Sequence, residues 1–176
     1  MIVDGLIPLD ANGRPINLDG VVATKIHTLV GDNETAAVPL FRITGNIEVR
    51  ALYGIVTTAI GSNHTAAYFR LNDQTAQVDI TASSGVTMSS LAAGSMIAKK
   101  GLTAAAAIAI NNSAGRINEP TTLETNYFGP FIMTKKTAAN TDIEYVYSTT
   151  QTPTTGAIQF YLRYIPLSDD AKVTVQ

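Results

Sequence analysis

The stretch "GAIQFYLRYIPLSDD", residues 156–170, decides the fold class of this chain. Read at a period of two, one face is apolar and predicts a strand packed on a core, and it carries Ile158, Phe160, Leu162 and Tyr164. The opposite face mixes an aromatic, a guanidinium and an aliphatic group, and it carries Gln159, Tyr161, Arg163 and Ile165. A monomer normally hides or avoids such a face, so the strand predicts a surface that another subunit covers.

The composition extends this β-strand prediction to the whole chain. Of 176 residues, 45% are hydrophobic and only 15% are charged, well below the roughly 25% of an ordinary soluble domain. Roughly one residue in eight is Thr, which is β-branched and suits half-exposed strands. The length favours one domain with its own core. A surface with so few charges is covered either by small polar side chains or by other subunits.

Charge, cysteine content and hydropathy exclude several kinds of partner. The net charge is −2 and the 12 Lys and Arg residues are scattered, which argues against direct nucleic-acid binding. Cys is absent, so disulfides and thiolate metal sites cannot stabilise the protein. No window approaches the ~20 apolar residues of a membrane span, and the first residues lack the basic and apolar regions of a signal peptide. We therefore expect no membrane partner and no export signal.

Short alternating segments separated by turn residues follow one another from residue 21 onward. The expected strands lie at 37–44, 46–60, 65–71, 76–81, within 85–101, 128–135, 142–150 and 156–167. The Ala-rich segment 102–110 has the composition of a helix but the alternation of a buried strand, and the strand is slightly favoured. Gly45-Asn46 predicts a hairpin between the first two, and Gly54 is interpreted as a bend or bulge in the second. The spacing predicts an all-β chain with a single domain at 21–176, an antiparallel, jelly-roll-like β-sandwich of about eight or nine strands.

Two segments do not fit the alternating pattern. Residues 1–20 are rich in Gly and Pro and predict an extended N-terminal arm, interpreted either as a disordered terminus or as a segment ordered on a neighbouring subunit. The candidate interface residues of this arm are apolar, namely Ile2, Val3, Leu6 and Ile7. The second segment, 115–127, predicts a long loop and hence a functional surface.

The residues that carry catalysis or bind metals are sparse. The chain has two His, His27 and His64, and it lacks the G-x-S-x-G, P-loop and H-E-x-x-H motifs. His27 is interpreted as a strand residue and His64 as part of a turn, neither of them a ligand. The stretch "DANG" at 10–13 lacks the alternating ligands of a calcium loop. The sequence thus predicts a protein that is not an enzyme and has no cofactor and no metal site.

An aromatic group surrounds the last expected strands and comprises Tyr145, Tyr147, Phe160, Tyr161 and Tyr164. Such a group can form a carbohydrate platform, but packing in a core or an interface is the favoured interpretation, with the interface taking the larger part.

Two motifs resemble those of a family of small virion structural proteins of tailed bacteriophages. The first is a pattern of the type "LF-V-TG-V-V--L-G-V-TAI", represented here by Leu40, Phe41, Ile43, Thr44, Gly45, Val49, Leu52, Gly54 and Val56. The second closes the chain with the type "G-I-FY--Y-PLS", represented by Gly156, Ile158, Phe160, Tyr161, Tyr164, Pro166, Leu167 and Ser168. Both are packing motifs, so the resemblance implies a place in the phage particle more than a chemical task.

The resemblance and the composition together favour a head decoration or cement protein. Such a protein would be made in the host cytoplasm, lie on the outer surface of the phage head and bind the major capsid protein. By analogy it would associate with itself, preferably as a trimer, through an interface that includes Tyr161, Arg163 and Ile165. The alternatives are a tail or neck component and a glycan-binding host-adhesion module that uses loop 115–127 and the tyrosines.

Overall fold

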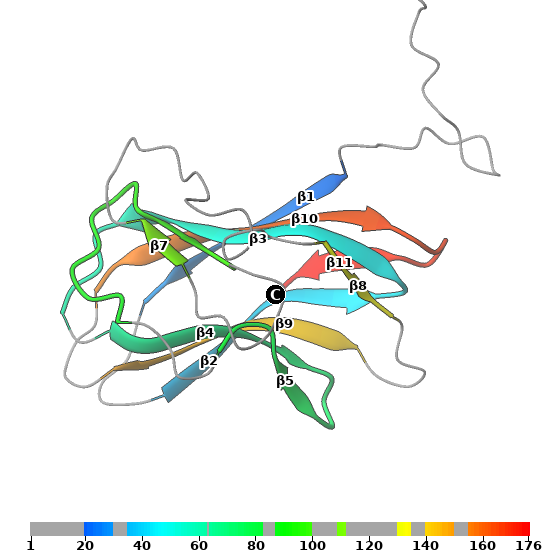
Figure 1. Cartoon of the computed structure of the whole chain (residues 1–176), viewed down its shortest axis with the longest axis horizontal. Coiled ribbons are helices and arrows are strands. Elements are labelled where there is room, and N and C mark those ends of the chain that lie inside the picture. Colours follow the sequence, from blue (N-terminus) through cyan, green and yellow to red (C-terminus); the bar gives the residue numbers. More distant parts are fainter. Residues whose placement is uncertain are drawn as a thin grey trace, which may run out of the picture.

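The computed structural model describes residues 20–29, 35–62, 64–82, 87–99, 109–111, 130–134, 140–149 and 155–176. Within these ranges the chain forms strands and no helix. Two antiparallel sheets pack face to face, one above the other in Figure 1, and confirm the predicted all-β sandwich. The apolar side chains of both sheets meet between them and form the core.

Sheet 1 contains the strand predicted at residues 156–167. Its order is β1 (Val21–Thr28), β10 (Ala157–Pro166), β3 (Ile47–Thr58), β6 (Met96–Ala98) and β7 (Ala109–Asn111). A further strand, β8 (Phe131–Met133), pairs with the beginning of β3. Sheet 2 has the order β11 (Lys172–Val175), β2 (Thr35–Thr44), β9 (Thr141–Thr149), β4 (His64–Asn72) and β5 (Gln77–Asp79).

Strand β10 has the two faces that its sequence predicts. Its buried face is the predicted apolar one and consists of Ile158, Phe160, Leu162 and Tyr164. Phe160 lies between the sheets, with its ring centroid 4.9 Å from that of Tyr145 and 6.0 Å from that of Phe69. Aromatic rings at such distances interact favourably beyond the area they bury. This cluster joins the central strands of the two sheets.

The predicted hairpin between residues 37–44 and 46–60 is wrong. Strands β2 and β3 lie in different sheets, and Gly45-Asn46 carries the chain from one sheet to the other. Gly45 has a φ of +77°, and a Cβ there would lie 2.7 Å from backbone atoms of Ala171. The backbone of Asn46 accepts a hydrogen bond from the Leu167 amide. The turn residues were therefore identified correctly, but they form a corner that the C-terminal segment holds.

The two faces of β3 exchange at Arg50, not at Gly54. Opposite β10, Ala51 pairs with Arg163 and Val49 pairs with Tyr164, so Arg50 is an extra residue in a bulge. Before this bulge the buried residues are Ile47 and Val49, and after it they are Leu52, Gly54 and Val56. Tyr53 and Ile55, which the alternation places on the same face as Val49, therefore lie on the outer face of sheet 1.

Gly54 serves close packing and not a bend. It lies opposite Phe160 on β10 and opposite Ile97 on β6. A Cβ at this position would lie only 2.8 Å from Cγ2 of Ile158 and 3.0 Å from Cγ1 of Ile97. Side chains from both neighbouring strands thus fill the space that a larger residue would need.

Several predictions fall on residues outside the described ranges. They are the arm, of which only Gly20 is described, the loop 115–127, and most of the Ala-rich segment 102–110. Its last two residues belong to the short strand β7. The prediction of a separate arm and a single domain at 21–176 therefore stays a prediction.

Candidate interaction surface

The outer face of sheet 1 carries a group of apolar and aromatic side chains. Pairing places Val22 beside Arg163, Thr24 beside Tyr161, and Tyr161 beside Tyr53 across β1, β10 and β3. We call this surface the apolar face and define it by Val22, Ile26, Tyr53, Ile55, Tyr161 and Ile165. Val22 and Ile26 are the most exposed of the six. Apolar groups that continue over several strands on a monomer's surface mark a site of interaction.

Two stacked tyrosines form the centre of the apolar face. The rings of Tyr53 and Tyr161 lie nearly parallel, with their centroids 4.8 Å apart and an interplanar angle of 9°. Partial burial, and then the neighbouring Tyr161, raise the pKa of Tyr53, while Arg163 acts in the opposite direction. The raised pKa keeps the Tyr53 hydroxyl neutral near neutral pH. Stacked tyrosines offer a rigid, wide contact with polar hydroxyl groups, a combination that is enriched in protein interfaces.

The candidate interface residues from the sequence fall into two groups. Tyr161, Arg163 and Ile165 lie on the outer face of sheet 1, where Tyr161 and Ile165 are half-buried and Arg163 is exposed. Ile2, Val3, Leu6 and Ile7 lie outside the described residues. The sequence did not single out Tyr53, because a strict alternation groups it with Val49, and the bulge at Arg50 reverses that alternation. Its position directly opposite Tyr161 becomes apparent only in the register of the sheet.

The outer face of sheet 2 is different in kind, because its charged groups bind one another. Arg42 holds Asp142 through two hydrogen bonds of 2.9 and 2.8 Å, and Arg70 holds Glu144 at 2.6 Å. Asn72 donates a further bond of 2.9 Å to Glu144. The hydrogen bond and the charge of Asp142 raise the pKa of Arg42 above its ordinary value. This surface satisfies its own polar groups and needs no partner to do so.

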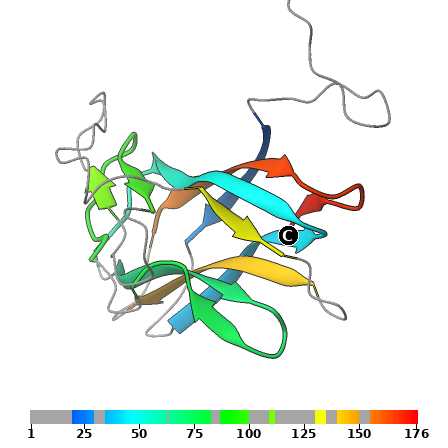
Figure 2. The same ribbon diagram turned by 45° about the vertical axis from the view of Figure 1, so that its right-hand side comes forward.

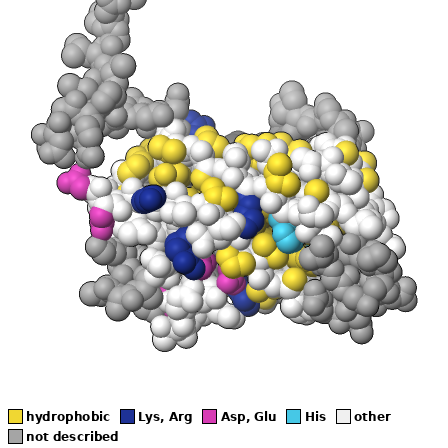
Figure 3. All heavy atoms as spheres, turned by 180° about the vertical axis from the view of Figure 1, so that it is seen from behind, with side chains coloured by type: hydrophobic (Ala, Val, Ile, Leu, Met, Phe, Trp, Pro, Cys, Tyr) yellow, Lys and Arg dark blue, Asp and Glu magenta, His cyan; other side chains and the backbone are white. Residues whose placement is uncertain are grey.

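A space-filling view shows how these side chains are distributed. In Figure 3, hydrophobic side chains gather mainly in the upper part of the molecule, at the level of sheet 1. Acidic and most of the basic side chains lie lower or toward one side of the same view. In this side view, hydrophobic side chains are thus more frequent at the level of sheet 1 than at the level of sheet 2.

The aromatic group predicted near the end of the chain is divided between core and surface. Tyr145, Tyr147 and Phe160 are fully buried, Tyr164 nearly so, and only Tyr161 lies on the outer face. Core packing, not interface packing, thus accounts for most of the group. The two fully buried tyrosines are not accessible to a glycan.

The two histidines belong to the same buried region. His27 lies in β1 as predicted, whereas His64 is the first residue of β4 and is fully buried, so its assignment to a turn is wrong. Its Nε2 lies 2.8 Å from the Tyr145 hydroxyl, and its ring centroid lies 4.5 Å from that of Tyr147. Burial, followed by the nearby His27, lowers the pKa of His64 to about 4. Both histidines have structural roles in the sandwich.

The described residues contain no group of three or more His, Cys, Asp or Glu side chains that could hold a metal ion. Within the same ranges no helix is long and apolar enough to cross a membrane. Comparison with protein families, curated proteins and solved structures finds no match for this chain. The apolar face is therefore the feature of the described structure from which a function can best be argued.

Proposed function

We propose that this protein is a non-enzymatic virion structural protein of a tailed bacteriophage. In this proposal it is a decoration or cement protein that binds the major capsid protein on the outside of the head and stabilises it. The observation that carries the proposal is the contrast between the apolar face of sheet 1 and the ion-paired face of sheet 2. A protein that binds a lattice on one side and faces water on the other needs these two surfaces.

The strand order supports the same proposal. Sheet 1 has the order β1, β10, β3 and β6, and sheet 2 the order β2, β9, β4 and β5, which supports a jelly-roll arrangement. Jelly rolls recur in viral capsid proteins, although they also occur in lectins and other proteins, so the fold supports the proposal only by analogy. The sequence resemblance to small virion proteins points in the same direction.

A decoration protein stabilises a capsid by burying surface against it and does not need to catalyse a reaction. A contact of standard size removes about 800 Å² from each partner, and the symmetry of a capsid repeats it many times. Aromatic and Arg side chains near the centre of such a contact carry most of the binding energy. Tyr53, Tyr161 and Arg163 have the chemistry and the position for this role.

The test uses purified heads and the double variant Tyr161→Ser/Arg163→Ser. We expect at least tenfold weaker binding to heads, because the variant removes both central contacts, while the circular dichroism spectrum stays that of a folded β protein. The matched control is Lys172→Ser/Thr174→Ser, which changes two exposed residues of β11 and should bind normally. Unchanged head binding and unchanged oligomer mass in the first variant would contradict the proposal.

The two alternative functions predict other outcomes. A tail or neck component would be missing from tail-less heads, and labelled protein would be seen on tails in images of the particle. An adhesion module would bind glycans or host cells by itself. Binding to tail-less heads together with a negative glycan-binding assay would support the decoration role over both alternatives.

A further inference from the structure

A cluster of two imidazoles and two phenol rings joins strand β1 to the opposite sheet. It consists of His27 on β1, His64 on β4, and Tyr145 and Tyr147 on β9. Nε2 of His64 lies 2.8 Å from the Tyr145 hydroxyl, and Nε2 of His27 lies 3.4 Å from the Tyr147 hydroxyl. The ring centroid of Tyr147 lies 4.5 Å from that of His64 and 6.0 Å from that of His27. Polar contacts therefore connect β1 with the interior of sheet 2.

Strand β1 is the edge strand of sheet 1 and is shallowly buried. It pairs with β10, none of its eight residues is fully buried, and Figure 2 shows it, in blue, behind β10 and β3. The side chains that it directs toward sheet 2 are Ala23, Lys25 and His27. Nζ of Lys25 donates hydrogen bonds to the backbone oxygens of Pro39, at 3.1 Å, and of Gln176. Two of the three inward side chains are thus a cation and a group that becomes a cation in acid.

No carboxylate among the described residues around the cluster balances a proton on either imidazole. Of β1, β2, β4, β9, β10 and the segment 87–91, only β9 carries carboxylates, and arginines bind both of them, Asp142 and Glu144, on the outer face of sheet 2. The charged group that acts on His27 is Lys25, and the group that acts on His64 is His27. Nδ1 of His64 is buried with no hydrogen-bond partner in the described part of the chain. Burial without a counter-charge disfavours a charged imidazole.

The same strand contributes to the apolar face. Val22 and Ile26 alternate with the inward side chains of β1 and lie on its outer side. The other residues of the apolar face lie on β10 and β3. The contacts that hold β1 against sheet 2 therefore also hold two residues of the apolar face in place.

We propose that His27 and His64 form an acid-sensitive support for β1, which releases this strand from sheet 2 when the imidazoles take up protons. Release exposes the imidazoles to water, where a bound proton costs less, so protons favour the released form. The inference deepens the proposed function by assigning its regulation. It rests on that function only for one consequence: acid weakens attachment to the head, because Val22 and Ile26 leave the apolar face.

The direction and size of the effect follow from the protonation of His64. Its pKa is about 4 in the closed sandwich and 6.5 in water, so the released form binds more protons between these values. Between pH 7 and pH 5 this difference increases the equilibrium constant of release by about twentyfold. Burial, and then Lys25, also lower the pKa of His27, which acts in the same direction. Burial, and then Tyr147, raise the pKa of Tyr145 well above its ordinary value, so this hydroxyl stays neutral.

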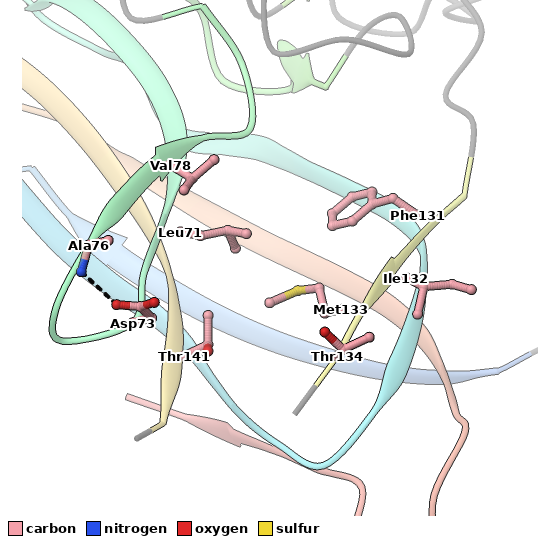
Figure 4. Close-up of a pocket in the computed structure, with 9 residues that line it drawn as sticks. All are labelled: Leu71, Asp73, Ala76, Val78, Phe131, Ile132, Met133, Thr134 and Thr141. Atoms are coloured by element: carbon pink, nitrogen blue, oxygen red, sulfur yellow. Dashed lines mark hydrogen bonds between the residues drawn. The ribbon is translucent and has the colours of Figure 1, made fainter. Parts of the chain in front are cut away.

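Hydrogen exchange of the purified protein tests the release of β1. Amide protection is measured near pH 7 and near pH 5 and corrected for the intrinsic exchange rate at each pH. We expect the protection of the β1 amides to fall by about twentyfold. The internal reference is the hairpin at residues 69–79, which lies at the edge of sheet 2, lines the pocket in Figure 4 and contains no histidine. Its protection should change much less.

Histidine variants show whether the imidazoles cause the response. His27→Gln/His64→Gln does not titrate in this range, so the protection of β1 should be nearly the same at both pH values. The single variant His27→Gln changes only a half-buried side chain, so it should fold even where the double variant does not, and its response should be smaller than that of the unchanged protein. The matched control is Thr28→Gln, at an exposed position of β1 outside the apolar face, which should keep the full response.

An equal loss of protection in β1 and in the reference hairpin would overturn the inference, as would a β1 response that persists undiminished in the histidine variants. Attachment is measured separately on purified heads, from which the unchanged protein should detach at a higher pH than the histidine variants. Detachment at the same pH would overturn the assigned regulation. A protein that releases β1 in acid but binds heads at no pH would contradict the decoration role and leave the acid-sensitive support standing.

Discussion

His64 and Tyr145 form a hydrogen bond of 2.8 Å inside the sandwich, where both side chains are fully buried. The rings of Tyr147 and His27 lie next to this pair, and Lys25 is the charged residue that acts on His27. An imidazole that is shut away from water is strongly biased toward its neutral form. The core therefore contains a titratable group whose protonation opposes folding.

The burial of His64 predicts a loss of stability in mild acid. The pKa of His64 falls from 6.5 in the unfolded chain to about 4 in the fold, so the unfolded chain binds more protons between these values. The free energy of unfolding should decrease as the pH falls from about 6.5 to about 4, by on the order of 3 kcal/mol from His64 alone. Urea unfolding near pH 7 and near pH 4 measures this decrease in the free energy of unfolding.

The control for this prediction is His64→Gln, whose amide stays neutral throughout that range. We expect it to lose less stability than the unchanged protein between the two pH values, whatever its stability near pH 7. His27→Gln should have a smaller effect, because His27 is only partly buried. Equal losses in His64→Gln and the unchanged protein would show that His64 does not cause the acid sensitivity.

The ion pairs should differ in their contribution to stability according to their burial. Arg70→Met leaves the buried Glu144 without its closest cation, and we expect it to cost roughly 2–4 kcal/mol of the free energy of unfolding. Arg50→Met breaks an exposed pair with Glu48 at 3.0 Å and should cost less than about 1 kcal/mol. Denaturant titration measures the free energy of unfolding of both variants. Similar losses would contradict the expectation that the buried ion pair contributes more than the exposed one.

The close packing around Gly54 predicts that even a single methyl group is too large there. Gly54→Ala should destabilise the protein by roughly 1–3 kcal/mol, because the neighbouring side chains must move. Ile158→Ala removes the nearest of these contacts, so adding Gly54→Ala in that background should cost much less. Thermal melts of the unchanged protein, the two single variants and the double variant measure how strongly the effects of the two substitutions on stability depend on each other. Simple additivity would mean that the methyl group causes no clash.

The sequence predicted the fold class and both faces of β10, because a period of two survives wherever a strand is regular. The sequence did not predict the features that depend on which strands pair and in which register. Gly45-Asn46 is a turn signal in either arrangement, and only the contacts of Ala171 and Leu167 distinguish a corner from a hairpin. The bulge at Arg50 has no local signature, so a strict alternation from Val49 places Tyr53 on the wrong face.

The burial of His64 shows the same limit for polar residues. "GSNHT" has the composition of a turn, and the partner that makes burial acceptable, Tyr145, lies 81 residues further along the chain. The candidate surface was predicted in part, since Tyr161, Arg163 and Ile165 follow from one strand. The residues that β1 and β3 contribute to this surface could be identified only from the register of the sheet.

The saturated ion pairs on the outer face of sheet 2 have a consequence for the amount of protein that a capsid can take up. Arg42, Asp142, Arg70 and Glu144 already bind one another, so this side offers little to an incoming copy. On the proposed function, attachment would stop after a single layer, at a fixed number of copies per head. The coat would then present a hydrophilic exterior to the medium, and excess protein would remain in solution.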